Sequence, residues 1–346
     1  MRSGRCRSIP LIDPGQHATR TTVQQSLRLD HRYAPWLDAL ESVGAPPYIV
    51  RLPDAQQAHR QLAELAVPDG PAAEALDALP SPAGDPEIWW LLERCQHRLV
   101  ADTGGFTRVQ AWPSLPLPLG AVGRYFYLYV FLAALPHVRS WHAANGVAPE
   151  ISRLTLADAG KQVEIHGRTH GAGGMHTQDW LTWHFRCALY RLGRLQFNRS
   201  EIGYDAERLE RAGAPFCHGD QALGTHIPEV GPLTPEACDA SLRQARPFFE
   251  ELFGGSTYRW ATCNSWLLDD QLAEYLPAGS NIIRFQRRFH LLPGGTDGDQ
   301  SVLEFVFRRP GADLSDLPQR TTLERAVVAH LRAGRHWVTR SGWLEL

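Results

Sequence analysis

The sequence predicts an α+β protein, with a mainly helical N-terminal half followed by a mixed sheet flanked by helices. Its 346 residues exceed one average domain and fit roughly two. Up to about residue 150, apolar residues recur with helical spacing, and from about residue 180 short strand patterns alternate with helical ones. We therefore expect four parts: a loose segment 1–24, a helical domain 25–150, a linking region 151–179 and an α/β domain 180–346.

The overall composition is that of a globular protein, with 43% hydrophobic and 21% charged residues. A formal net charge of −2 gives no basic surplus, so nucleic acid is not an expected partner. The 35 basic residues include one lysine, Lys161. Because Lys161 lies outside any G-x-x-x-x-G-K motif, a phosphate group would have to be held by backbone N–H groups or arginine.

The cysteines and the most apolar stretch indicate in which cellular compartment the protein is expected. The six cysteines are widely spaced without a C-x-x-C motif, and the N-terminus carries no secretory pattern. The run 125–135 is shorter than the roughly 20 residues that a bilayer span needs, which favours a buried helix. These features predict a reduced, cytoplasmic protein that does not associate with a membrane.

In the N-terminal half, two long helices stand out. Asp85 as N-cap and Pro86 at the first position predict a helix that ends near Gly104. A second helix is expected over 125–145, with a break or kink at Pro136.

The C-terminal half is predicted to alternate between the two kinds of element. Helices are expected at 180–191, 234–254, 268–276 and 321–334, where Thr234 is an N-cap and Thr321 with Glu324 fits a capping box. Strands are expected at 192–202, 222–231, 258–266, 281–291, 301–309 and 336–346.

Several segments resemble a bacterial family of two-domain acyltransferases. They are "DPEIWWLLERC", "YFYLYVFLAALPHVRSWH", "YRLGRLQF", "GTHIPEVGPLTPEACDASL", "SWLLDDQLAEYLP", "SNIIRFQRRF" and "PQRTTLERAVVAHLRAG". In that family a helical acyltransferase-associated domain precedes a GNAT-like domain, named after a superfamily of N-acyltransferases. The resemblance covers nearly the whole chain beyond residue 25.

The resemblance implies an acyl-CoA donor, with acetyl-CoA the first expectation, and direct transfer to an amine of a small molecule or peptide. An acyl carrier protein could replace coenzyme A because both carry the pantetheine arm. In a GNAT fold this arm inserts between two splayed strands, and no metal is required. Pro228 within a strand pattern agrees with a splay, because proline donates no ladder hydrogen bond.

The loop after the strand at 222–231 is the expected pyrophosphate site, because a helix N-terminus presents free N–H groups. The family pattern Q/R-x-x-G-x-G/A is replaced here by Glu229-Val230-Gly231-Pro232-Leu233-Thr234, so an ordinary strand-to-helix connection is the alternative. Residues expected to contact the cofactor are Ile227, Val230, Gly231, Leu233, Thr234 and Asn264.

Four residues are candidates for the chemistry. His226 is the first candidate base for the amine, since histidine titrates near neutral pH, and Glu229 acting through a water is the second. Ser265 and Tyr275 are candidates to protonate the leaving thiolate. The alternative is that His226 is a packed strand residue and that the others are caps or core.

Three further patterns of histidine, aspartate and arginine support weaker functional interpretations. His218 and Asp220 could form a hydrolase dyad, although Gly219 between them favours a turn. The histidines at 166, 170, 176 and 184 do not favour a metal, because the first three are expected in a glycine-rich loop that does not fix ligand geometry. Arg284, Gln286 and Arg288 would share one strand face. The main alternative function is a catalytically silent GNAT-like module that binds coenzyme A or regulates.

Overall fold

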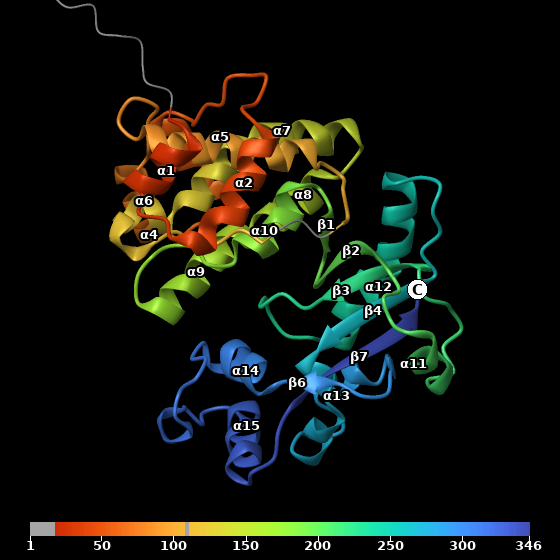
Figure 1. Cartoon of the computed structure of the whole chain (residues 1–346). Coiled ribbons are helices and arrows are strands. Elements are labelled where there is room, and N and C mark those ends of the chain that lie inside the picture. The colour runs from red at the N-terminus through yellow and green to blue at the C-terminus, as the bar shows by residue number, and fades with distance from the viewer. Residues whose placement is uncertain (1–17, 108–110) are drawn as a thin grey trace, which may run out of the picture.

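The computed structural model describes residues 18–107 and 111–346, and the predicted segment 1–24 lies mostly outside them. Its first half is helical and lies beside a sheet, with further helices at the far end (Figure 1). The helices of the first half are α1 Arg20–Ser26, α2 Ala34–Val43, α3 Ala55–Glu64, α4 Asp69–Asp77, α5 Pro86–Ala101, α6 Gly120–Arg124, α7 Phe126–Ala144, α8 Pro149–Leu156, α9 Asp158–His170 and α10 Gln178–Phe185.

Helix α7 is the centre of the helical core. Its residues from Phe126 to Leu132 are at most 2% exposed, and it continues through Pro136, where a break was expected. By length and composition alone, Leu117–Ala144 could cross a membrane, but 56% of its most apolar window is buried inside the protein. A core helix passes the same test, and the enclosed side chains of α7 fit that explanation.

The predicted linking region 151–179 is mostly helical. It contains α9 and most of α8, and α9 begins at Asp158 inside the expected link. Gly160 lets α9 pack closely on the connection between α3 and α4, because a Cβ there would lie 2.0 Å from the carbonyl oxygen of Ala66. The helical part of the chain therefore extends to Phe185.

The second half is built on a mixed sheet. Its strands are β1 Leu189–Leu192, β2 Leu195–Glu201, β3 Gln221–His226, β4 Trp260–Ser265, β5 His290–Leu291, β6 Thr296–Asp297 and β7 Val338–Glu345. The order is β1-β2-β3-β4-β7-β5, with β6 also on β7. The helix expected over 180–191 ends early, because β1 and β2 form a hairpin that turns at Gly193. Within the described residues only β3 and β4 pair in parallel, and α12 Pro235–Leu252 connects them.

Strands β3 and β4 separate toward their C-terminal ends. Their ladder contains Ala222↔Trp260, Leu223↔Ala261 and Gly224↔Thr262, and it stops there although both strands continue. Beyond that point β3 still pairs with β2, and β4 with β7. This is the splay that the GNAT-like fold predicts, and it lies directly before the loop 227–234.

Two strands expected near the C-terminus are helices instead. Ser280 caps α13 Asn281–Gln286, and α14 Asp299–Val302 continues into a π-helix at Leu303–Phe307. The prediction was wrong because alternating apolar and polar residues in so short a stretch fit both periods, and the Ser280 cap favours a helix. Two other helices, α11 Ala206–Arg211 and α15 Thr322–Arg332, complete this half.

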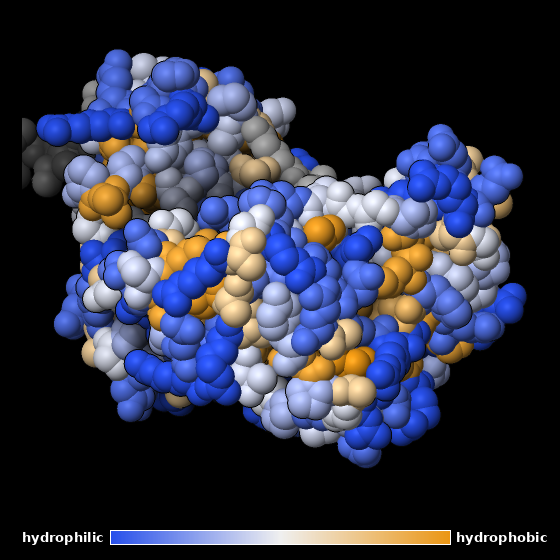
Figure 2. Space-filling model, turned by 90° about the horizontal axis from the view of Figure 1, so that it is seen from below, coloured by the Kyte–Doolittle hydropathy of each residue, from blue (hydrophilic) through white to orange (hydrophobic). Residues whose placement is uncertain are grey.

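The predicted row of Arg284, Gln286 and Arg288 therefore does not lie on a strand face. Gln286 donates to the backbone carbonyls of Leu267 and Asp269, both at 2.8 Å. Arg288 pairs with Asp239 of α12 at 2.7 Å. Both side chains thus fasten α13 to neighbouring elements. Seen from the α14–α15 side, the surface alternates between hydrophilic areas and separate apolar patches (Figure 2).

Candidate active site

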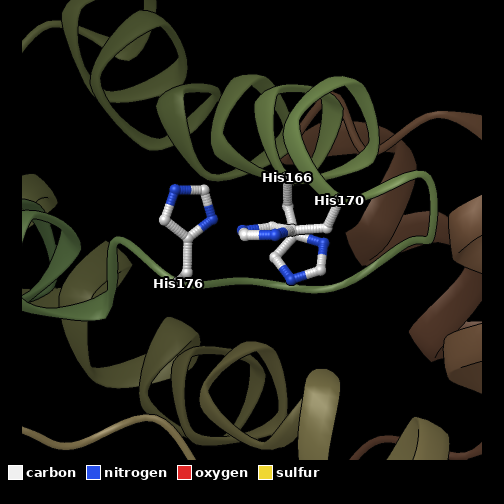
Figure 3. Close-up of side chains that lie close together, drawn as sticks. All are labelled: His166, His170 and His176. Carbon is white, nitrogen blue, oxygen red and sulfur yellow. The ribbon is translucent and has the colours of Figure 1, made fainter. Parts of the chain in front are cut away.

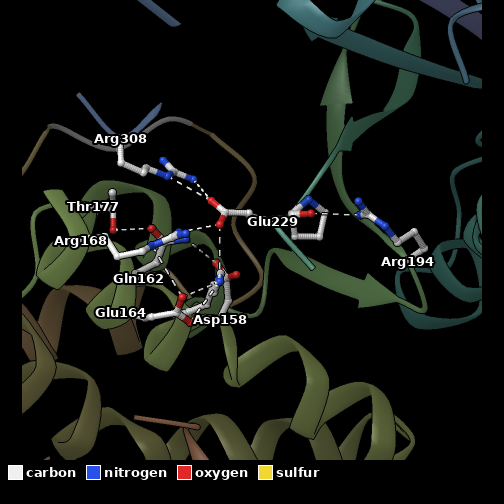
Figure 4. A network of polar contacts seen from close by, with 10 residues as sticks. Asp158, Gln162, Glu164, Arg168, Thr177, Arg194, Glu229 and Arg308 are labelled. Atoms are coloured by element: carbon white, nitrogen blue, oxygen red, sulfur yellow. Dashed lines mark hydrogen bonds and ion pairs between the residues drawn. The ribbon is translucent and has the colours of Figure 1, made fainter. Parts of the chain in front are cut away.

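The loop between β3 and α12 is fixed by an arginine from the β1–β2 hairpin. The Arg194 guanidinium donates to the carbonyl oxygens of Pro228 at 3.0 Å, Gly231 at 3.1 Å and Pro232 at 3.1 Å. Gly231 has a φ of +59°, a conformation that glycine adopts without strain. One side chain therefore holds three carbonyl groups of the loop on the hairpin side, and Figure 4 shows Arg194 on the far side of the loop from the ion pairs of Glu229.

The backbone N–H groups of this loop are available to a ligand. Val230 donates to the carbonyl of Pro228 at 2.8 Å, whereas Gly231, Leu233 and Thr234 donate to no other residue that the structure describes. The Thr234 side chain caps α12 by accepting from the N–H of Ala237. Free N–H groups and the positive end of an 18-residue helix together form an anion site. Ile227 and the buried Leu233 pack on the core, so only their backbone is placed for this role.

His226, the last residue of β3, lies beside the splay. Its Nε2 is 2.6 Å from Asn198 Oδ1 on β2. The Asn198 amide nitrogen donates to the Arg199 carbonyl at 2.7 Å, which fixes Oδ1 as the atom that faces the imidazole. Because Oδ1 can only accept, Nε2 carries the proton, and Nδ1 keeps the lone pair that a base needs.

The helix α10 closes this side of His226. The Trp180 indole packs edge-on against the imidazole, with ring centroids 4.7 Å apart. The Trp180 Nε1 donates to the buried carboxylate of Asp158 at 2.9 Å. The fully buried His184 lies next to them, with its Nε2 3.2 Å from the amide nitrogen of Gln196. Burial lowers the pKa of His226 to about 4, with a smaller contribution from His184. His226 is therefore a neutral imidazole at physiological pH.

Glu229, three residues further on, has the opposite surroundings. Its carboxylate accepts from Arg168 at 2.6 Å and pairs closely with Arg308 (Figure 4). The ammonium of Lys161 lies 3.6 Å away. Burial raises the pKa of Glu229, but the hydrogen bonds from Arg308 and Arg168 outweigh it and leave the pKa below its usual value. A carboxylate held by three cations is a poor proton acceptor, so this geometry favours a role in joining α9 to the π-helix.

The residues expected to protonate the thiolate lie apart from one another. Ser265 ends β4, where its Oγ accepts from the N–H of Leu267 at 3.1 Å. Asn264 precedes it and is exposed. The Tyr275 hydroxyl lies 3.1 Å from His330 Nδ1 and its ring packs on Trp337, both in the core around α15. The splayed end of β4 thus presents Ser265 and Asn264, whereas Tyr275 is engaged elsewhere.

The segment of His218 and Asp220 is a turn, as Gly219 predicts, and not a hydrolase dyad. Gly219 has a φ of +87°, and Asp220 accepts from the backbone N–H of Cys217 at 2.7 Å. The His218 Nδ1 lies 3.1 Å from the Tyr204 carbonyl. No hydrogen bond or ion pair between His218 and Asp220 exists among the described residues.

The histidines of the 166–184 region do not all lie in a loop. Because α9 extends to His170, His166 and His170 are four residues apart on one helix. The premise that a glycine-rich loop carries the first three was therefore wrong for two of them, and their arrangement is taken up below.

Sequence reasoning missed Asn198, Trp180, Arg194 and Arg308 as parts of the site. Asn198 faces His226 only through the pairing of β2 with β3, where it is the Cα partner of Gly224. Trp180 belongs to a segment whose sequence predicts a helix but not the contact of that helix with His226. Gly193 beside Arg194 is a turn signal, so this hairpin could have been found from the sequence.

The comparisons with known proteins agree with this fold. Residues 56–187 match an N-acyltransferase N-terminal domain, and residues 189–344 match a GNAT-like C-terminal domain. No curated protein matches the chain. Several solved structures match at 45% identity with a TM-score of 0.87.

Two of these structures cover 95% of this chain and 100% of their own: an acyltransferase with decanoyl-CoA and teicoplanin, and one with CoA and 10C-teicoplanin. A third is a tryptophan-to-alanine acyltransferase mutant with octanoyl-CoA, which covers 94% of this chain and 99% of its own. The fold and these matches thus define a GNAT-like N-acyltransferase. The chain belongs to the two-domain N-acyltransferase family that has this pair of domains.

Proposed function

We propose that this enzyme transfers a medium-chain acyl group from acyl-CoA to an amine of a glycopeptide of the teicoplanin type. The observation that carries the proposal is the full-length similarity, at 45% identity, to acyltransferases solved with octanoyl-CoA, decanoyl-CoA and teicoplanin. Those ligands carry eight- and ten-carbon acyl chains. They support a longer chain than the acetyl group first expected, and coenzyme A as the carrier rather than an acyl carrier protein.

The free N–H groups of the loop are the proposed grip for the pyrophosphate of the donor. Gly231, Leu233 and Thr234 supply N–H groups at the start of α12, where the helix dipole also favours negative charge. Arg194 holds the loop carbonyls away from this side, so the departure from the family glycine pattern is compatible with phosphate binding. The pantetheine arm would then enter between β3 and β4 beyond Gly224.

His226 is the proposed general base. The amine nitrogen attacks the thioester carbonyl carbon, a C–N bond forms, and the carbonyl electrons move onto oxygen. His226 Nδ1 takes the proton that the nitrogen loses. The tetrahedral intermediate then collapses and the C–S bond breaks, with the Ser265 hydroxyl at the end of β4 as the candidate hydrogen-bond donor to the leaving thiolate. The thiolate takes up one proton, which balances the proton that His226 has accepted and returns to solvent. Backbone N–H groups released by the splay would stabilise the oxyanion.

The test is a transfer assay with a series of donors. Purified enzyme is incubated with teicoplanin lacking its acyl chain and with acetyl-, octanoyl- or decanoyl-CoA. Released thiol is measured together with the mass of the product. We expect octanoyl- and decanoyl-CoA to give the amide with a higher kcat/KM than acetyl-CoA. Equal or better use of acetyl-CoA would overturn the chain-length proposal.

The same assay separates the alternative functions. Binding of coenzyme A, seen as a rise in melting temperature, without transfer to teicoplanin or to any simple amine would support the silent module instead. Thiol release without an acylated product would indicate a thioesterase. Transfer to simple amines but not to the glycopeptide would support N-acyl transfer as the reaction but would refute the glycopeptide as the acceptor.

A further inference from the structure

Three histidines outside the proposed active site converge on one point. Helix α9 places His166 and His170 one turn apart on one face, and His176 approaches from the segment before α10 (Figure 3). One ring nitrogen of each lies within 4.8 Å of the other two. The ring centroids are 4.5 to 5.3 Å apart. Three imidazoles with nitrogens this close are a typical set of transition-metal ligands.

The tautomer of His166 suits metal binding. Its Nδ1 lies 2.7 Å from the backbone carbonyl of Ala172, so Nδ1 carries the proton and donates to that oxygen. Nε2 is then left with a free lone pair. A backbone carbonyl that orients the second nitrogen in this way is the usual outer shell of a metal-binding histidine.

Two further features of the cluster agree with metal binding: Gly174 beside His166, and a buried nitrogen of His176. A Cβ at Gly174 would lie 2.9 Å from His166 Nε2, so only glycine leaves this edge of the imidazole uncovered. The Nδ1 of His176 is buried and has no hydrogen-bond partner among the residues that the structure describes. An unpartnered buried nitrogen is costly unless something binds it or its neighbours.

The glycine-rich segment that carries His176 is held in place. Arg124 donates to the carbonyl of Gly173 at 2.8 Å, and the N–H of Met175 donates to the carbonyl of Arg124 at 2.9 Å. Arg124 is itself paired with Glu74 of α4. The loop thus presents its histidine in a fixed position, contrary to the expectation from its composition.

We propose that His166, His170 and His176 form a three-imidazole site for Zn²⁺. A tetrahedral zinc with bonds of about 2.0–2.1 Å sets its ligand nitrogens roughly 3.4 Å apart, so small ring rotations bring all three into place. The fourth position is open to water on the side of the exposed His170. The ion would tie α9 to the segment that leads into α10, the helix whose Trp180 packs on His226. This inference does not rest on the proposed acyl transfer.

Direct metal binding tests the site. The full chain without a histidine tag is treated with chelator and titrated with Co²⁺, whose visible absorption reports tetrahedral coordination, and then with Zn²⁺ to displace it. We expect one ion per chain and a melting temperature that rises by several degrees with zinc. His170→Ala should lower the affinity more than about 10-fold, because a lost ligand costs at least as much as a lost outer-shell partner.

The matched control is His59→Ala, since His59 is also exposed on a helix but lies outside the cluster. His170→Ala and His176→Gln are checked for native circular dichroism before titration. If the intact chain binds no stoichiometric metal, or if His59→Ala and His170→Ala bind equally well, the site does not exist. Because the readout is metal binding, this outcome is independent of whether the chain acylates a glycopeptide.

Discussion

His226 and Glu229 lie three residues apart and were both plausible bases, yet their surroundings are opposite. His226 is enclosed by neutral partners, with Asn198 on one side and Trp180 on the other. Glu229 is surrounded by Arg168, Arg308 and Lys161. Neutral surroundings leave a lone pair available, whereas a cationic cage keeps a carboxylate charged and engaged. The two environments, rather than the residue types, therefore favour His226 over Glu229 as the proposed base.

The largest expected effect comes from replacing the imidazole. His226→Asn removes the base but keeps a polar side chain of similar reach, so kcat should fall about 10²- to 10⁴-fold. Steady-state release of coenzyme A measures it. His218→Ala serves as the control and should leave kcat unchanged, since His218 lies in the turn before β3. A nearly full rate in His226→Asn would remove this residue from the mechanism.

A smaller effect is expected from the residue that orients the imidazole. Asn198→Asp puts a carboxylate beside His226 Nε2, which favours the protonated ring and raises its pKa above the present value of about 4. At neutral pH, kcat should stay within about 10-fold of the unmodified value, because a base is most effective when its pKa is near the working pH, but the acid limb of the pH profile should move to higher pH. The acceptor amine also titrates, but it affects the pH profiles of the unmodified enzyme and of Asn198→Asp in the same way. An unshifted limb would mean that Asn198 does not act through His226.

Glu229→Gln should change catalysis least. We expect kcat within about 10-fold of the unmodified enzyme, because the carboxylate binds arginines rather than protons. Loss of the charge leaves Arg308, which is 9% exposed, without its partner, so the free energy of unfolding should drop by about 1–3 kcal/mol. Urea denaturation measures this. A 10³-fold loss of kcat in a folded variant would instead make Glu229 the base.

The pH dependence of the free energy of unfolding also distinguishes His226 from Glu229. A histidine whose folded pKa lies near 4, below its usual 6.5, leaves the unfolded chain with more protons between those values. Its contribution is complete above about pH 6.5 and is lost as the pH falls toward 4. Glu229 has a lowered pKa, so its contribution is lost only below its usual value of 4.5.

Denaturation midpoints across this range should therefore respond differently in the two variants. His226→Asn should flatten the slope between pH 6.5 and 4, and Glu229→Gln should flatten it below 4.5. His142 and His176, which also have pKa values of about 4, keep the upper slope from vanishing. A slope that flattens below pH 4.5 in His226→Asn, or between pH 6.5 and 4.5 in Glu229→Gln, would contradict these protonation states.

Local signals in the sequence predicted much of the fold. Thr234 with Pro235 and the capping box of Thr321 with Glu324 mark helix starts that the structure confirms. The segment 281–309 was misassigned because its short amphipathic stretches fit either period until Ser280 is recognised as a cap. Residues 151–170 were read as a link because glycines and scattered histidines conceal the helical pattern of α9.

The active site was predicted only in part, for a physical reason. His226 and the loop 227–234 could be found because a strand, a proline and a helix cap follow one another along the chain. Asn198 and Trp180 reach His226 across the sheet and from a packed helix, and a single sequence carries no register or packing information. The ion pairs of Glu229 come from residues 61 and 79 positions away.

The single lysine has a consequence for an enzyme that handles activated acyl groups. Thioesters acylate free amines without help, so every side-chain amine near the donor is a competitor for the acceptor. This chain has one such amine, Lys161, and its ammonium is held by Glu164 at 3.0 Å and lies 3.6 Å from Glu229. An ammonium has no lone pair, and guanidinium groups remain protonated at these pH values. The protein thus carries its positive charge in a form that its own donor does not consume.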